Sequence, residues 1–202
     1  MIKIYNFPRG LRGVRVFWVC EEMGLPYQTE AVTFPQSADY RARHALGFVP
    51  YLEDEGGIAI NESVAMMLYL AQKYGPTPLL PAKDDPSLAR VMQMTVFSET
   101  TLGAGINTLL IAHFMAPDAE KQNWSIKAQE PRVVQAIDYA ANMLGDAPYF
   151  AGNTFTLADI AISTSLGIWQ GALKKPIPDK LVAFRERLSE RPAYQRALKA
   201  QQ

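Results

Sequence analysis

The chain has 202 residues, of which 49% are hydrophobic and 20% charged, and this composition favours a packed globular protein over a disordered one. Lys+Arg and Asp+Glu both number 20, so no basic excess favours nucleic-acid binding, and the single cysteine excludes an internal disulfide and a thiolate zinc site. No apolar run approaches the roughly 18 residues of a membrane span, and the first residues form no signal-peptide core, so we expect a cytoplasmic protein without nucleic-acid, membrane or metal partners.

The first 77 residues alternate between strand-like and helical patterns. Ile2–Asn6 has the two-residue period of a strand, and an apolar helix is expected from Leu11 to Met23, just before Gly24. The further elements expected in this part are a strand at 27–33, a helix at 36–45, strands at 50–53 and 57–60 around a turn, and a helix at 62–74. This order predicts a parallel βαβ unit followed by a hairpin.

A proline-rich stretch separates this part from a helical remainder. Four prolines lie between residues 75 and 86, and we assign residues 78–86 to a linker because proline stiffens the chain. Helices are then expected at 87–115 (straight or bent), 118–144 (which could break at Pro131), 156–172, 179–188 and 193–200. Thr156 and Asp159 have the spacing of a capping box. The sequence thus predicts an α/β domain over residues 1–77 and an all-α domain over residues 87–202.

Three short segments of the first part suit a small peptide ligand. A cis Val49–Pro50 bond would turn the Val49 N–H and C=O toward an extended peptide. Glu62 and Ser63 begin a helix, where the free N–H groups and the serine hydroxyl suit a carboxylate and the Glu62 carboxylate suits an ammonium. The loop over residues 6–13 carries an asparagine and two arginines that would stabilise a thiolate. Each segment also has a structural interpretation, as a common dipeptide, an ordinary helix cap and a solvated basic loop.

The combination of these segments resembles the cytosolic glutathione transferases. The resemblance rests on GFVPYL at residues 47–52, NES at 61–63 and TLAD at 156–159, and it covers essentially the whole chain. It implies a thioredoxin-like N-terminal domain followed by a helical-bundle C-terminal domain. It also implies a homodimer, with Met66, Met67, Leu70 and the helix from Ser87 as contributors.

The resemblance implies that glutathione lies extended along the first domain as cosubstrate. Val49 would pair with its cysteinyl backbone, Glu62 and Ser63 would hold its γ-glutamyl end, and Arg12 or His44 would hold its glycyl carboxylate. The residues assigned to glutathione binding are Val49, Pro50, Glu62, Ser63, His44 and Phe48.

The thiol-activating residue of the family has no match in this chain. Asn6 stands where the family has a tyrosine, and Gly10–Gly13 cover the positions of its serine or cysteine, with no hydroxyl or thiol among them. Tyr5 is adjacent but should point to the opposite face of its strand. The catalytic candidates are therefore Asn6, Arg12 and Tyr5. The Asn6 amide, the N–H groups of the helix start and Arg12 could together lower a thiol pKa of ~8.5 by one or two units without accepting the proton. Cys20, inside an apolar helix, is expected in the core.

A second substrate would bind where the helical part faces the thiol. The candidate lining is Phe7, Leu11, Met94, Phe97, Ser98, Thr101 and Leu102, although a stripe of Met and Phe is also typical of a core. The predicted function is conjugation of glutathione to small apolar electrophiles, as in detoxification. The alternatives are a glutathione-dependent isomerase, dehalogenase or peroxidase, or a non-catalytic glutathione- or ligand-binding protein.

Overall fold

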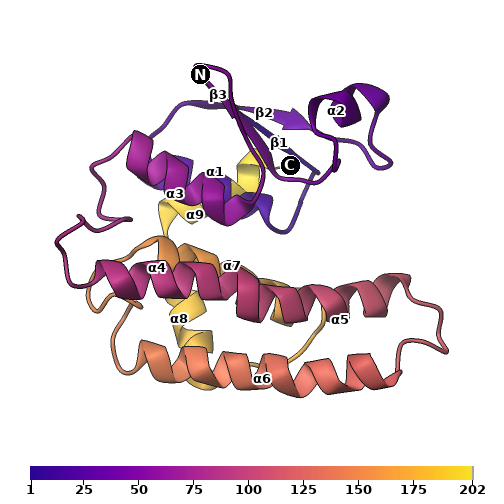
Figure 1. Ribbon diagram of the computed structural model, residues 1–202. Helices are drawn as coiled ribbons and strands as arrows, with labels where there is room; N and C mark the ends of the chain where they lie inside the picture. Colours follow the sequence, from indigo (N-terminus) through magenta and orange to yellow (C-terminus); the bar gives the residue numbers. More distant parts are fainter. Residues whose placement is uncertain (202) are drawn as a thin grey trace. The chain divides into compact units, whose positions relative to one another are not determined.

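The computed structural model describes residues 1–201 of the chain (Figure 1). These residues form two compact units, one made of residues 1–80 with 188–201 and the other of residues 81–187. The boundary at residue 80 falls inside the proline-rich stretch. The C-terminal segment, which the sequence analysis assigned to the helical domain, lies in the first unit because α9 (Pro192–Ala200) packs against α1 (Gly13–Met23).

The first unit is built on a four-stranded mixed sheet with the order β2-β1-β3-β4. The strands are β1 (Ile2–Asn6), β2 (Tyr27–Ala31), β3 (Tyr51–Asp54) and β4 (Ile58–Ile60). β1 runs parallel to β2 and antiparallel to β3, and β3 pairs antiparallel with β4. The parallel pair requires a crossover, which α1 supplies. The predicted βαβ unit and hairpin are confirmed.

Helices of the first unit pack mainly around α1. Residues 13–20 of α1 are all buried, since this helix packs against α3 (Ser63–Lys73) as well as α9. It ends at Gly24, which has the left-handed φ of 63° that the sequence predicted for a glycine cap. A short α2 (Ala38–Arg43) begins at Ser37, whose hydroxyl accepts from the Tyr40 N–H. Met66, Met67 and Leu70 of α3 are 0% exposed in the single chain, so the expectation that they contact a second subunit is wrong.

The second unit is helical throughout (Figure 1). Its elements are α4 (Leu88–Phe97), η1 (Ser98–Gly103), α5 (Ala104–Met115), α6 (Trp124–Leu144), α7 (Leu157–Gly171) and α8 (Asp179–Ser189). The long helix expected over 87–115 is interrupted by η1, a π-helical turn, where the hydroxyls of Thr95 and Ser98 bond to backbone carbonyls. α6 begins at Trp124, later than expected, and continues through Pro131.

The core of the second unit surrounds α7, whose start confirms the predicted capping box. The Asp159 carboxylate accepts from the Thr156 N–H at 2.7 Å and from the Phe150 N–H at 2.9 Å, so it ties two chain segments together. Burial raises the pKa of Asp159 to about 6, although these hydrogen bonds act in the opposite direction. Within residues 1–201, no helix has the length and apolar character needed to cross a membrane.

Candidate functional site

The sheet register brings the three segments that the sequence predicts to bind a peptide ligand to one edge of the first unit. They are the β1–α1 loop, Val49–Pro50 and Glu62–Ser63. In the β3–β4 hairpin Leu52 lies opposite Ile60, so continuing this register two residues outward places Pro50 opposite Glu62. In the β1–β3 pair Tyr5 lies opposite Tyr51, so Asn6 comes opposite Pro50 by the same reasoning. The ends of β1 and β4 and the start of β3 therefore meet at one place.

Val49 and Pro50 stand just outside the paired part of β3, which begins at Tyr51. The Val49–Pro50 bond is cis, as predicted. Val49 is half-buried, whereas the Phe48 side chain is 63% exposed. The Tyr40 hydroxyl donates to the Phe48 carbonyl at 2.6 Å, which fixes the chain just before the cis bond.

The N-terminus of α3 follows β4 directly, and the continued register of the hairpin places it beside Pro50. Glu62 precedes the helix with a φ of 71°, a left-handed conformation that costs a non-glycine residue about 1–3 kcal/mol and is concentrated at ligand-binding positions. Its side chain is exposed. Ser63, the first residue of α3, is 4% exposed. The first N–H groups of α3 and the Ser63 hydroxyl thus form a site with the electrostatics of an anion-binding helix start.

A buried arginine lies beneath this helix start and was not among the residues predicted for the site. Arg15 of α1 is 0% exposed, and its Nη1 donates to Ser63 Oγ at 2.9 Å. The sequence held a signal for it, because Arg15 is three and four residues from Trp18 and Val19 and so shares their apolar helix face. A guanidinium on such a face must find a polar partner inside the fold.

Asn6 lies beneath the β1–α1 loop. It is 2% exposed, and a Cβ at Gly10 would lie 2.6 Å from its Oδ1, while a Cβ at Gly13 would come even closer to its amide. Its Nδ2 donates to Gln201 Oε1 at 3.4 Å, and Arg9, which has a φ of 58°, donates its N–H to the Gln201 carbonyl at 2.8 Å. Among residues 1–201 the buried Asn6 Oδ1 has no hydrogen-bond partner. The role of Gln201 could not be read from the sequence, since the contact spans almost the whole chain.

Tyr5 lies on the other face of the sheet, so the structure does not bring it together with Asn6. Its ring packs with those of Tyr40 and Tyr51, and its hydroxyl donates to Glu53 Oε2 at 2.9 Å. Burial and the bond to Glu53 raise the Tyr5 pKa above its usual value. His44, 7% exposed, stacks on Tyr51 with ring centroids 4.8 Å apart, so it is part of this aromatic packing.

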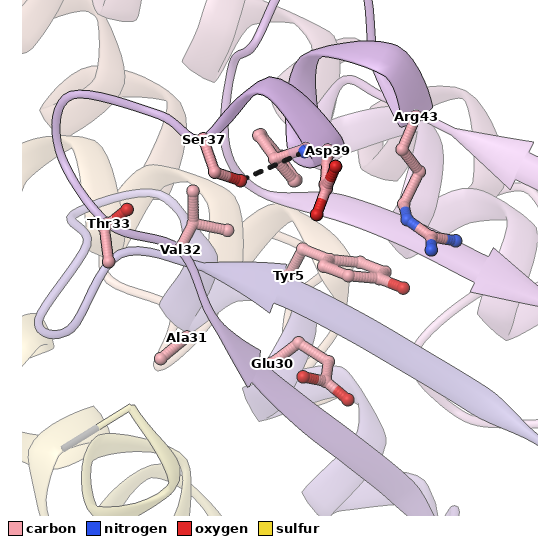
Figure 2. Close-up of a pocket in the computed structure, with 9 residues that line it drawn as sticks. Tyr5, Glu30, Ala31, Val32, Thr33, Ser37, Asp39 and Arg43 are labelled. Atoms are coloured by element: carbon pink, nitrogen blue, oxygen red, sulfur yellow. Dashed lines mark hydrogen bonds between the residues drawn. The ribbon is translucent and has the colours of Figure 1, made fainter.

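A hollow of about 290 Å³ lies on the same side as Tyr5, between β2 and α2 (Figure 2). Figure 2 shows the Tyr5 ring at its centre, with Glu30 and Arg43 on the strand and helix beside it. Both charges already have partners, since Glu30 pairs with Lys3 at 3.0 Å and Arg43 with Glu53 at 2.9 Å. The lining of this hollow includes none of Asn6, Pro50 and Glu62, the residues that the register brings to one edge.

The candidate lining of the second-substrate site differs in exposure. Met94, Ser98 and Leu102 are 0% exposed, whereas Thr101 is exposed. The Phe97 ring contacts Tyr139, with centroids 5.3 Å apart. In the first unit, the half-buried Phe7 packs against the Tyr5 cluster and Leu11 is 51% exposed. A pocket formed by these residues stays a prediction.

Cys20 has the properties of a core residue, as predicted. It is 0% exposed, and burial raises its thiol pKa to about 12, which leaves no thiolate at neutral pH. In the part of the chain that the structure describes, no three His, Cys, Asp or Glu side chains gather closely enough to hold a metal ion.

Known proteins match both parts of the chain. Residues 13–73 match the glutathione S-transferase N-terminal domain and residues 105–192 match the glutathione S-transferase C-terminal domain. Glutathione S-transferase GstA of Escherichia coli O157:H7 is 30% identical over 165 residues, which cover 81% of this chain and 78% of GstA. The chain belongs to the glutathione S-transferase family.

Solved transferase structures have the same fold over the full length. A glutathione transferase from Methylococcus capsulatus str. Bath superposes with a TM-score of 0.85 at 25% identity, covering 100% of this chain and 98% of that one. The theta class enzyme of Xanthomonas axonopodis pv. citri, whose structure has glutathione bound, has a TM-score of 0.81 at 27% identity over 98% of this chain and 96% of its own.

Proposed function

We propose that this transferase-family chain binds glutathione along the edge where β1, β3 and β4 end. The observation that carries the proposal is the β3–β4 register, with Leu52 opposite Ile60, which puts Pro50 opposite Glu62 when it is continued past the paired residues. In an extended tripeptide the cysteinyl backbone would pair with Val49, and the γ-glutamyl head would lie at the start of α3. There its carboxylate meets the Ser63 hydroxyl and helix N–H groups, and its ammonium meets the exposed Glu62 carboxylate. Phe48 and His44, or Arg12, would border the glycyl end.

The thiol would lie against the β1–α1 loop. Asn6 is packed under Gly10 and Gly13, so its burial makes it a support for this loop. The half-buried Arg12, at the N-cap of α1, and the first N–H groups of that helix are then the donors that can face a sulfur. Donors and positive charge stabilise a thiolate, but none of them accepts the proton, which would leave to water.

The reaction that fits this chemistry is attack of the thiolate on a small apolar electrophile. The sulfur forms a bond to an electrophilic carbon, and the leaving group departs with the bonding electron pair. Because the loop has no hydroxyl or thiol activator, we expect turnover to be modest. Substrates to compare are a chloro-nitroarene, an organic peroxide and a halomethane, which distinguish conjugation, peroxide reduction and dehalogenation.

Binding and activation are tested in separate steps. Calorimetry with glutathione tests binding, with Glu62→Gln as the site variant and Glu55→Gln, an exposed carboxylate on the hairpin, as the matched control. Loss of affinity confined to E62Q supports the proposal, and no heat with the wild-type chain at millimolar glutathione contradicts it. The ultraviolet absorbance of bound glutathione against pH then tests activation, because absence of a thiolate at neutral pH would leave a binding protein without transferase chemistry.

A homodimer is part of the same proposal. Since Met66, Met67 and Leu70 are core residues, the apolar surface for a second subunit would come from the exposed face of α4, where Met92 is 47% and Val96 is 43% exposed. Light scattering of the wild-type chain and of Val96→Glu tests this assignment. A monomeric wild-type chain would contradict it.

A further inference from the structure

Arg15 is a cation held entirely inside the first unit. Its side chain is 0% exposed, in a stretch of α1 where residues 13–20 are all buried. Full burial of an arginine is rare, because a guanidinium gives up strong hydration when it leaves water. A neutral residue of similar size would fill the same space without this penalty, so the charge calls for a role beyond packing.

The Arg15 bond to Ser63 determines what the serine can do. A serine hydroxyl has one hydrogen to donate and two lone pairs to accept with. Arg15 Nη1 donates to Ser63 Oγ at 2.9 Å, so one lone pair is taken from inside the fold. An arginine cannot accept a hydrogen bond, so the Ser63 hydrogen is directed elsewhere.

Two sources of positive potential coincide at this hydroxyl. Ser63 is the first residue of α3, where the helix dipole and the unpaired N–H groups attract negative charge. The Arg15 guanidinium polarises the same oxygen from behind, which makes its O–H a stronger donor. Glu62, which directly precedes Ser63, has a left-handed φ of 71°.

We infer that Arg15 is a positioning residue that turns Ser63 into a dedicated donor for the α-carboxylate at the γ-glutamyl end of the ligand. The inference rests on the proposed function and goes beyond it, because it assigns the selection of that carboxylate to a residue that the ligand does not touch. Arg15 acts through Ser63, and its effect is specific to one chemical group of the ligand.

The test compares two ligands that differ only in that group. Glutathione and 4-aminobutyryl-cysteinyl-glycine, which lacks the α-carboxylate, are titrated by calorimetry into the wild-type chain, Arg15→Gln and Arg15→Lys. We expect the wild type to prefer glutathione by about 10- to 100-fold, the range for one hydrogen bond to a charged group. In R15Q that preference shrinks toward unity while the affinity for the analogue stays the same, and R15K retains part of the preference.

Arg196→Gln is the matched control, since Arg196 lies in the same unit and bonds to Glu21 of α1. It should leave the ligand preference at the wild-type value. Equal weakening of both ligands by R15Q would mean a merely structural role and would overturn the inference. If R15Q does not fold, the test uses R15K and Ser63→Ala instead. A preference for glutathione that equals the wild-type value in both of these variants overturns the inference. A wild-type chain that binds both ligands equally overturns the inference alone, whereas one that binds neither overturns the proposed function as well.

Discussion

Replacing Asp54 by asparagine should loosen the hairpin from α3 and destabilise the first unit. The Asp54 carboxylate accepts from the Lys73 Nζ at 2.9 Å and from the Tyr69 hydroxyl at 2.8 Å, both on α3. It also accepts from the Tyr74 hydroxyl at 2.7 Å and from the Glu55 N–H at 2.7 Å. This cluster connects the β3–β4 turn to the helix whose first residues form the proposed binding site.

The size of the effect follows from how the bonds divide between the two oxygens. Oδ2 accepts from Lys73, Tyr69 and Tyr74, and Oδ1 accepts from Glu55 and Tyr74. An asparagine keeps one oxygen, and the Tyr74 hydroxyl has a single hydrogen for both oxygens. An amide with its oxygen at the Oδ2 position therefore loses the Glu55 bond and leaves the other donors on a neutral acceptor. The loss of one bond to a charged acceptor costs about 1.5–3 kcal/mol, so we expect the free energy of unfolding to fall by about 2 kcal/mol at pH 7.

The pH dependence provides a second check. The hydrogen bonds and Lys73 hold the pKa of Asp54 well below its usual range, although burial acts in the opposite direction. A lowered pKa in the folded state means that the stabilisation is complete above the unfolded pKa of about 3.9 and is lost as the pH falls through the folded value. The difference between wild type and D54N should therefore be constant from pH 7 to 5 and shrink below pH 4.

The first assay is equilibrium urea unfolding at several pH values. The second is a short deuterium pulse on the native protein with mass spectrometry of the peptide over residues 63–73, which measures how firmly α3 is held. Glu55→Gln is the control, because Glu55 is 76% exposed in its ion pair with the N-terminus and such pairs contribute less than about 1 kcal/mol. A D54N chain as stable as E55Q, or a difference that persists unchanged at pH 3, would refute the reasoning.

Three further outcomes are expected. Asp159→Asn should lower the free energy of unfolding of the second unit, measured in urea. The difference from wild type should grow by about 1 kcal/mol from pH 7 to 5, because a pKa raised to about 6 means that the wild-type native state gains stability as Asp159 binds its proton. A difference that does not change with pH would contradict this. Cys20 should react with maleimide on the order of a thousandfold more slowly than free cysteine at pH 8, until urea exposes it; rapid native labelling would show that it is not buried. Gly13→Ala should lower the free energy of unfolding by about 2 kcal/mol, and by much less when Asn6 is also replaced by alanine. Gly171→Ala is the control, since the space around Gly171 is open and the substitution should be tolerated. An equal effect of Gly13→Ala with and without Asn6 would exclude the clash.

Local patterns were sufficient to place most elements. The two-residue period at Ile2–Asn6, the glycine at position 24 and the Thr156–Asp159 spacing each act over a few neighbouring residues, and the structure confirms them. The cis bond at Val49–Pro50 was also a local expectation. Such features are predictable because the free energy that fixes them comes from the chain within one or two turns.

Long-range partners were the part that the sequence could not supply. The pattern at 193–200 predicts a helix, but no local feature indicates that the Tyr194 ring packs against Trp18, with ring centroids 4.5 Å apart. Arg191 and Arg196 then pair with Glu22 and Glu21 of α1, and these contacts join the segment to the first unit. The same limit applies to Arg15, whose burial was indicated by its helix face while its partner Ser63 was not.

Packing around Asn6 gives a physical reason why two positions of the β1–α1 loop, Gly10 and Gly13, have no side chain that could activate a thiol. A serine or cysteine at Gly10 or Gly13 would need a Cβ, and at both positions that atom would overlap the Asn6 carboxamide. Asn6 cannot move aside easily, because it is 2% exposed and bonded to Gln201. The residue at the end of β1 and the small residues of the loop therefore depend on each other. With an amide filling this space, positions 10 and 13 have no room for a hydroxyl or thiol side chain, so the absence of an activator at these two positions follows from the packing of the strand end.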